Sequence, residues 1–265
     1  MQTVFIKIGG SAITDINKES TAKKEEIKRL LNEIKPCLDK KKVLVGHGSG
    51  SFAHIPAHKY KLNLGLTEKD SLYGASVTQS AAAKLHRIVV ECAVQEGLST
   101  FSFSPSTTAV AKGGRIFNWD VSAIEEAFEL GFLPITYGDV VLDKKQGVCI
   151  ASTEEVFRAL SKKIKPEKLI IGTDVDGIFD KDPKLSPDAT LIKEVNKNNI
   201  KDVLNYSGKS TKIDVTGGMK SKVSYLYEIS KETGAVCQIV NLQKPGRLKD
   251  AILGNEVIGT IINAN

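Results

Sequence analysis

Short apolar runs that end in glycine recur along the chain and alternate with stretches of helical periodicity. The runs are rich in β-branched residues and have the length of buried strands. They lie at residues 3–10, 42–48, 132–139 and 167–177. Between them, apolar residues recur at helical spacing in 20–40 and 72–96. Strand–helix alternation with short connections predicts an α/β fold, in which helices cover both faces of a mostly parallel sheet.

The rest of the chain continues the same pattern. We expect a hairpin over 140–152, helices at 153–163, 198–206 and 218–233, and strands at 235–241 and 258–263. No internal repeat, low-complexity tract or linker separates these segments. The sequence therefore predicts a single domain over residues 1–265.

Composition narrows the protein class. Hydrophobic residues make up 41% of the chain and charged residues 26%, as in ordinary globular proteins. No apolar run reaches eighteen residues, and the first ten residues resemble a strand rather than a signal peptide. The four cysteines are scattered without CxxC spacing, at Cys37, Cys92, Cys149 and Cys237. We therefore expect a cytoplasmic protein without disulfides, structural zinc or membrane insertion.

The net charge of +6 is compatible with a nucleic acid, a membrane surface or a small phosphorylated ligand as partner. Only five of the 37 basic residues are arginine, the residue that reads base edges best, and aromatic residues are sparse. Lysine serves well as a point charge toward phosphate. We therefore expect a small phosphorylated partner and no nucleic acid.

Glycine clusters stand where the predicted strands end. They lie at 9–10, 46–50, 138, 172–177 and 217–218. Ligands of open α/β sheets bind at the carboxyl ends of strands, where glycine lets backbone N–H groups approach an anion. None of the clusters matches GxxxxGK[ST] or GxGxxG, so the predicted phosphate site has another design.

Three motifs in order along the chain resemble the amino acid kinase superfamily. They are KIGGSAIT at 7–14, GTDVDGIFDKDPK at 172–184 and VTGGMKSK at 215–222. The resemblance implies an open αβα sandwich that transfers a phosphoryl group from ATP to a carboxylate or a phosphate. Within the superfamily, VGHGSGSFAH at 45–54 and TYGDVV at 136–141 resemble the isopentenyl phosphate kinase branch, whose glycine loop supplies a histidine to the acceptor phosphate.

This resemblance implies a reaction and its partners. We expect ATP-dependent conversion of isopentenyl phosphate to the diphosphate by a homodimer. An acceptor-binding lobe would cover about residues 1–165 and a nucleotide-binding lobe about 166–265. Mg²⁺ would arrive with the nucleotide, held by phosphate oxygens and water, with no metal site formed by the protein.

The resemblance also implies which residues act. Lys7, His54, Asp174 and Lys222 would be catalytic, with the first, third and fourth also contacting ATP. Further ATP contacts would come from Gly9, Gly10, Ser11, Gly50, Gly177, Phe179, Lys181, Asp182, Gly217 and Gly218. Further acceptor contacts would come from Gly48, Ser49, Gly138 and Asp139. Physical chemistry supports phosphate contacts for both lysines. Lys7 interrupts a predicted buried strand, and Lys222 lies in the first turn of a predicted helix, where the dipole attracts phosphate.

The two histidines of the glycine segment have different expected roles. His47 stands at a strand end and is expected to be packed and hydrogen bonded. His54 matches the family histidine and would anchor the acceptor rather than abstract a proton, because a phosphate is already a nucleophile. A metal site would need further ligands that the segment lacks.

The chain departs from the family pattern in three places. Ser49 and Ala53 replace usual glycines, and Ile16 replaces a usual lysine, with Lys18 as its candidate substitute. An acidic motif is replaced by STEE at 152–155, which resembles a helix cap more than a ligand clamp. We expect the acceptor's tail to lie against the helix at 72–96, where 75–78 are small, and against 136–141.

Four alternatives stay open at this point. The acceptor could be fosfomycin or another small phosphonate, or a carboxylate. The chain could also be a nucleotide-binding regulator without catalysis, which the joint presence of Lys7, Asp174 and Lys222 disfavours. A nucleic-acid-binding protein would show steeply salt-dependent binding that ignores ATP.

Overall fold

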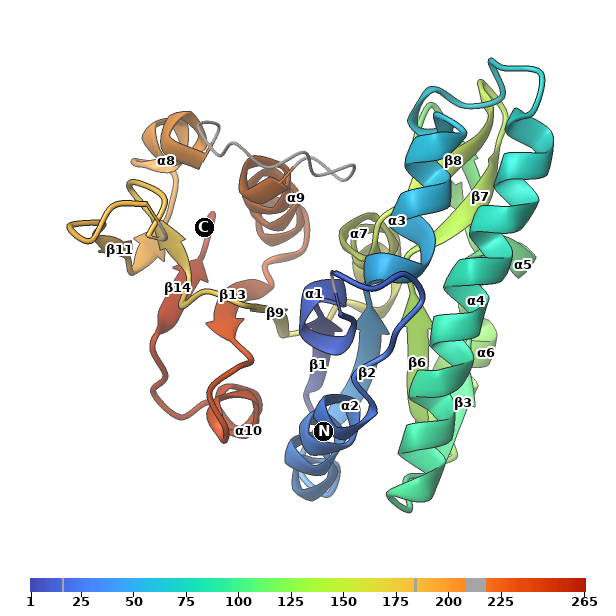
Figure 1. The fold of residues 1–265 in the computed structure, drawn as a ribbon. Coiled ribbons are helices and arrows are strands. Elements are labelled where there is room, and N and C mark those ends of the chain that lie inside the picture. Colours follow the sequence, from blue (N-terminus) through green and yellow to red (C-terminus); the bar gives the residue numbers. More distant parts are fainter. Residues whose placement is uncertain (16, 184, 208–217) are drawn as a thin grey trace.

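The computed structural model describes residues 1–15, 17–183, 185–207 and 218–265 (Figure 1). Within these ranges the main sheet has the strand order β12-β14-β13-β9-β1-β2-β6-β3. Its strands are Thr3–Ile8 (β1), Lys42–His47 (β2), Thr100–Ser102 (β3), Leu133–Tyr137 (β6), Lys168–Thr173 (β9), Glu194–Val195 (β12), Val236–Asn241 (β13) and Gly259–Ile262 (β14). Neighbouring strands are parallel, apart from the antiparallel pair β13 and β14. The predicted mostly parallel sheet is confirmed.

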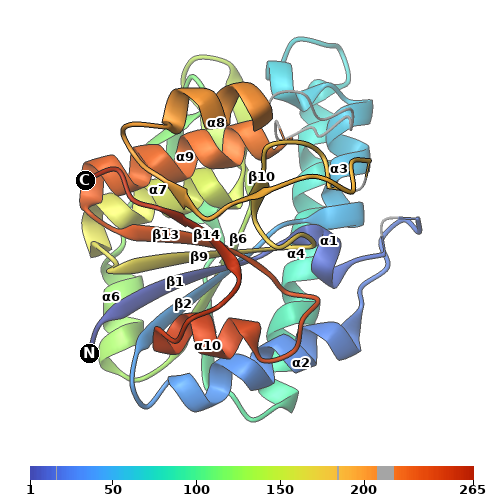
Figure 2. The same ribbon diagram turned by 90° about the vertical axis from the view of Figure 1, so that its left-hand side faces the viewer.

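Helices cover both faces of the sheet, as predicted (Figure 2). One face packs against Lys24–Ile34 (α2), Ser71–Gln95 (α4) and Arg247–Leu253 (α10). The other packs against Ser122–Glu129 (α6), Thr153–Ile164 (α7), Ile200–Ser207 (α8) and Gly218–Thr233 (α9). Side chains of β1 alternate between the two cores, since Ile6 and Ile8 join the first and Phe5 the second. The αβα sandwich is therefore confirmed.

A smaller sheet, ordered β5-β4-β7-β8, contains the predicted hairpin. Its strands are Val110–Lys112 (β4), Arg115–Asn118 (β5), Asp139–Asp143 (β7) and Gly147–Ala151 (β8). Strands β7 and β8 pair antiparallel, with Val141 opposite Cys149. The remaining short elements are Gly10–Ile13 (α1), Lys35–Cys37 (η1), Leu62–Leu64 (η2), Pro105–Thr108 (α5), Ile178–Phe179 (β10) and Leu191–Ile192 (β11).

One helix beside the glycine segment was not predicted. Residues Gly50–Lys59 form α3, where the sequence suggested a loop continuing through residue 54. At its start Gly50 has a φ of +47°, and a Cβ there would come within 2.1 Å of Thr14 Oγ1, so only glycine fits without strain. His54 is consequently held by a helix rather than by a loop.

Two further observations concern the protein class. All four cysteines are buried free thiols, in agreement with the expected lack of disulfides. In the part of the chain that the structure describes, no helix is both long and apolar enough to cross a bilayer. The division into an acceptor lobe and a nucleotide lobe remains a prediction.

Candidate active site

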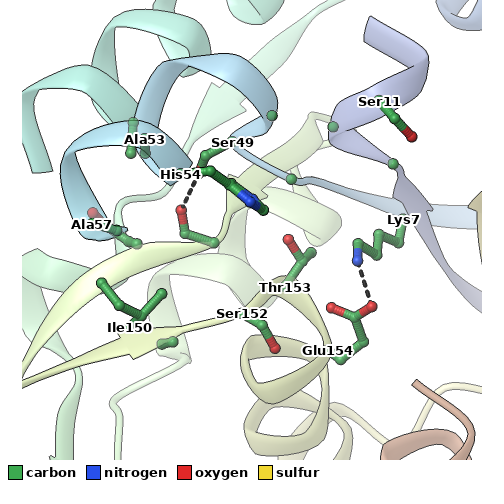
Figure 3. Close-up of a pocket in the computed structure, with 18 of the residues that line it drawn as sticks. Lys7, Ser11, Ser49, Ala53, His54, Ala57, Ile150, Ser152, Thr153 and Glu154 are labelled. Atoms are coloured by element: carbon green, nitrogen blue, oxygen red, sulfur yellow. Dashed lines mark hydrogen bonds and ion pairs between the residues drawn. The ribbon is translucent and has the colours of Figure 1, made fainter. Parts of the chain in front are cut away.

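A cavity of about 540 Å³ opens at the carboxyl edge of the main sheet (Figure 3). Its lining comes from the ends of β1, β2, β6 and β9, together with residues of α3, α4, α7 and α9. These are the glycine-rich strand ends that the sequence singled out. The topology brings them together because carboxyl ends of parallel strands share one edge of a sheet.

Most of the predicted site residues line this cavity. They are Lys7, Gly9, Gly10, Ser11, Gly48, Ser49, Gly50, His54, Gly138, Asp139, Asp174 and Lys222. His54 and Lys7 enter the cavity from α3 and β1 (Figure 3). The structure therefore places the four predicted catalytic side chains around a single space.

The remaining predicted residues that the structure describes lie elsewhere. Among the described residues, the cavity lining does not include Gly177, Phe179, Lys181, Asp182 or Gly218. The Lys181 amine pairs at 2.5 Å with the exposed Asp188 carboxylate. Gly217 and Ile16 lie outside the described residues, and Lys18 is exposed and not part of the lining.

Lys7 is buried in the centre of the sheet and paired with a carboxylate. Its strand lies between β2 and β9, and only 7% of the residue is exposed. The amine forms an ion pair with Glu154, in the first turn of α7. Burial alone would raise the pKa of Glu154, but the nearby charges of Lys7 and Lys222 hold this pKa below its ordinary value. Glu154 is therefore ionised at neutral pH.

Glu154 is the charged residue of the cavity lining that sequence reasoning missed. Ser152 does cap α7, since its hydroxyl accepts from the Glu155 N–H at 3.2 Å, so the expected cap exists. Glu155 turns away from the cavity and accepts from Arg158 Nε at 2.8 Å. Glu154, however, pairs with Lys7 rather than with the helix end. The available signal was a pair of carboxylates immediately after a strand end.

Two glycine turns form the floor of the cavity by packing backbone against backbone. A Cβ on Gly10 would come within 2.4 Å of the Gly50 nitrogen, and a Cβ on Gly48 within 2.9 Å of the Gly10 nitrogen. Thr14 connects the two turns by hydrogen bonds: its hydroxyl donates to the Gly10 carbonyl at 2.8 Å and accepts from the Ser51 N–H at 3.1 Å. Backbone this close suits a bound anion such as phosphate.

The other end of the cavity is apolar. Its lining there comprises Ala53, Ile55, Ala57, Thr78, Ala82, Val140 and Ile150. Of the small residues at 75–78, only Thr78 belongs to this lining; Ala75 packs instead in a separate cluster with Leu62. The cavity thus joins a glycine-lined end that contains the lysines to a hydrocarbon-lined end.

Asp139 stands at the edge of the cavity in a backbone-bonded position. Its carboxylate accepts from the Ser106 N–H at 3.1 Å and from its neighbour Val140 N–H at 2.8 Å. Burial raises the pKa of Asp139 above its ordinary value, although these hydrogen bonds act in the opposite direction.

Within the described ranges, no group of three or more His, Cys, Asp or Glu side chains is placed to hold a metal ion.

His47 is packed behind the glycine turn, as the sequence predicted. It is 0% exposed, and its ring lies within hydrogen-bonding distance of His86 on α4. Burial lowers the pKa of His47 to about 4. Burial and, secondarily, the neighbouring His47 lower the pKa of His86 to about 2. Both rings are neutral at pH 7.

Known proteins are similar to this chain in both sequence and fold. The model of the amino acid kinase family matches residues 2–241. The chain belongs to this family. It is 34% identical to the isopentenyl phosphate kinase of Methanothermobacter thermautotrophicus and 32% identical to that of Methanocaldococcus jannaschii, in each case over 98% of both chains. The resemblance found in the motifs is thereby confirmed.

Solved structures also resemble this chain in fold. X-ray structures of isopentenyl phosphate kinase match with a TM-score of 0.85 at 30% identity, covering 98% of this chain and 100% of theirs. A UMP kinase from Ureaplasma parvum matches with a TM-score of 0.67 at 16% identity, which shows the shared fold alone. The predicted fold class is confirmed by these matches together with the sheet topology.

Removal of the Glu154 carboxylate should destabilise the protein. Glu154→Ala takes a buried partner from the Lys7 ammonium, and breaking a buried ion pair from one side costs about 3–5 kcal/mol. We expect urea denaturation to show a fall in the free energy of unfolding of that order. Glu126→Ala, at an exposed position of α6, is the matched control and should change it by less than about 0.5 kcal/mol. Equal effects of the two changes would contradict the pairing.

The buried histidine pair should make stability fall in mild acid. Both pKa values are below the ordinary 6.5, so between pH 6.5 and about 4 the unfolded chain binds more protons than the folded one. The free energy of unfolding should then decrease as pH falls, by about 1.4 kcal/mol per pH unit for each fully titrating ring.

Urea denaturation from pH 7.5 to 5 measures this slope. The variant His86→Leu should flatten it, because one of the two rings is gone, while His58→Leu, at an exposed position of α3, should leave it unchanged. Besides His47, the groups that face His86 are the Tyr137 ring, the Ser102 hydroxyl and Arg87, whose charge contributes to the lowered pKa of His86. An unchanged slope in His86→Leu would contradict the prediction.

Proposed function

We propose that the chain is an isopentenyl phosphate kinase, which transfers the terminal phosphoryl group of ATP to the phosphate of isopentenyl phosphate. The observation that carries this proposal is the cavity itself. A histidine, a buried lysine and two glycine turns surround one end, and small apolar side chains surround the other. Isopentenyl phosphate has a matching shape, with an anionic head and a short hydrocarbon tail.

The chemistry follows from this placement. An oxygen of the acceptor phosphate attacks the terminal phosphorus of ATP, a new P–O bond forms, and the bond to the leaving ADP oxygen breaks. No general base is needed, because the attacking oxygen is already anionic. Catalysis then consists of positioning the two reactants and neutralising charge on the migrating oxygens.

Each side chain has a proposed task in that step. His54 donates a hydrogen bond to the acceptor phosphate, and Lys7 neutralises the oxygens between donor and acceptor. Lys222, the fifth residue of α9, holds the terminal phosphates of ATP near the start of the helix, where the dipole also favours anions. We propose that Glu154 keeps Lys7 in place through their ion pair, and that Asp174 shares in orienting the lysines.

ATP and Mg²⁺ are expected to enter together. The described residues offer carboxylates at Asp174 and Glu154 but no three-ligand cluster, and this set fits an ion held mainly by phosphate oxygens and water. The ion would neutralise phosphate charge. The adenosine part extends beyond the cavity, and we propose that Gly177, Phe179, Lys181 and Asp182 contact it there.

A coupled ADP-release assay tests the acceptor. We expect turnover with isopentenyl phosphate and other short alkyl monophosphates, and none with fosfomycin, glutamate or carbamate. Turnover of an amino acid without turnover of any monophosphate would overturn the proposed function. Turnover restricted to a phosphonate would assign the enzyme to that alternative.

His54 should carry the discrimination for a phosphate acceptor. The variant His54→Ala removes a charge-assisted hydrogen bond worth about 1.5–3 kcal/mol, so kcat/KM for the acceptor should fall about ten- to hundredfold. His54→Gln keeps a donor and should lose less. The control is His58→Ala, one turn later on α3 and exposed. Steady-state kinetics with full efficiency in His54→Ala would show that the histidine does not anchor the acceptor.

A homodimer is also part of the proposal, together with a cytoplasmic location. In support of the dimer, β3 stands at the end of the strand order and carries Phe101, which is 50% exposed. Its ring lies 5.3 Å from that of Phe103 and 5.6 Å from that of Phe132. An open strand edge with exposed aromatic rings favours association.

The four buried free cysteines suit a reducing compartment such as the proposed cytoplasmic location.

Substitution in this aromatic group should release the subunits. We expect Phe101→Glu to shift the molar mass in size-exclusion chromatography with light scattering from dimer to monomer, because a charge replaces apolar contact area. Phe117→Glu, at an equally exposed phenylalanine on β5, should remain dimeric. A dimer that survives Phe101→Glu would place the interface elsewhere.

A further inference from the structure

Two histidines lie side by side behind the glycine turn, outside the cavity lining. His47 Nε2 is 3.0 Å from His86 Nδ1, and the rings are nearly parallel. At the near end, His47 Nδ1 is 3.1 Å from the Gly48 carbonyl oxygen. At the far end, His86 Nε2 is 2.6 Å from the Ser102 hydroxyl. The four groups form a continuous chain of hydrogen bonds from β3 to the cavity floor.

The direction of these hydrogen bonds follows from chemistry. A carbonyl oxygen only accepts, so His47 Nδ1 carries a proton and donates to Gly48. Because the ring is neutral, its Nε2 must accept, and His86 Nδ1 is therefore the donor. His86 Nε2 then accepts from the Ser102 hydroxyl. Every ring nitrogen has a partner only when both histidines carry their proton on Nδ1.

The surroundings hold these rings in place. The Tyr137 ring stacks on His86 with centroids 4.3 Å apart and on His47 with centroids 5.7 Å apart. The His47 carbonyl accepts from Thr153 Oγ1 at 2.8 Å and from the Gly138 N–H at 3.1 Å. His47 thus joins three segments of the cavity: the glycine turn, the start of α7 and the end of β6.

The bond from His47 bears on a single peptide group. The Gly48–Ser49 peptide is planar, so the Ser49 N–H points opposite to the Gly48 carbonyl. With that carbonyl directed to the buried ring, the N–H is directed away from it, and Ser49 lines the cavity. Glycine at position 48 would otherwise let this peptide rotate freely.

We propose that His86 is a positioning residue for phosphoryl transfer: through His47 it fixes the Gly48–Ser49 peptide, so that the Ser49 N–H is presented to the acceptor phosphate. His86 touches neither reactant in this arrangement. It supplies the donor that the buried His47 Nε2 requires while Nδ1 holds Gly48. The inference rests on the proposed function only in that the anion at the glycine turn is the acceptor phosphate.

Histidine NMR tests the hydrogen-bond chain without any substrate. The chain has four histidines, so ¹⁵N-labelled rings give few signals, and two-bond correlations distinguish Nδ1–H from Nε2–H tautomers. At pH 7 in the ligand-free protein, we expect His47 and His86 both to be neutral and protonated on Nδ1. An Nε2–H tautomer or an imidazolium at His47 would overturn the proposal, whatever the acceptor is.

Kinetics then separate positioning from packing. His86→Asn keeps a donor at the place of Nδ1 but is smaller, whereas His86→Leu fills space but donates nothing. We expect kcat/KM for the acceptor to fall about tenfold in His86→Leu and by about twofold in His86→Asn, with KM for ATP unchanged in both. His58→Leu and His58→Asn are the matched controls and should match the unmodified enzyme.

The relative activities of the two His86 variants decide between positioning and packing. If His86 only fills space, leucine should preserve activity better than asparagine, and that result would overturn the proposal. If the unmodified enzyme turns over no phosphate acceptor, the proposed function fails, while the NMR result still reports on the hydrogen-bond chain.

Discussion

The burial of the Lys7 ammonium in the central strand is the constraint on which the site depends. A charge at this depth is stable only with a compensating partner, and Glu154 supplies it from α7. The pair fixes how α7 begins relative to β1, and that helix start also carries Thr153, which donates to the His47 carbonyl. The ion pair and this hydrogen bond together connect the lysine, the acidic helix start and the glycine turn.

The sequence predicted the sheet well because its strands are locally distinct. The runs at 3–10 and 42–48 are β-branched, short and closed by glycine, and they became β1 and β2. Helix α3 was not predicted, because it begins with Gly50 and contains Pro56, and both residue types have low helix propensity. Its formation depends on packing against α4, a contact that no local pattern contains.

The candidate site was predictable where residues act through motifs, and not where they act through distant partners. The motif residues Lys7, His54 and Lys222 do line one cavity. Glu154 was read as a cap residue because Ser152 is a genuine cap two positions earlier, while its partner Lys7 is 147 residues away. His86 gave no sequence signal at all, since its contact with His47 spans 39 residues and depends on how α4 crosses the sheet.

The charge arrangement of the cavity bears on what kind of acceptor it suits. Lys7 and Lys222 together hold the pKa of Glu154 below its ordinary value although burial acts against them, so these two lysines supply the positive charge at the glycine-lined end. An amino acid acceptor would bring an ammonium group close to these lysines, or would need a carboxylate partner for it at the opposite end. That end is lined by Ala57, Ala82 and Ile150, which are uncharged. The carboxylate of the lining residue Asp139 already accepts from the Ser106 and Val140 N–H groups, and burial raises its pKa. A monophosphate with a hydrocarbon tail places all its charge beside the lysines and none at the apolar end, so its tail is buried there without the cost of desolvating a charge.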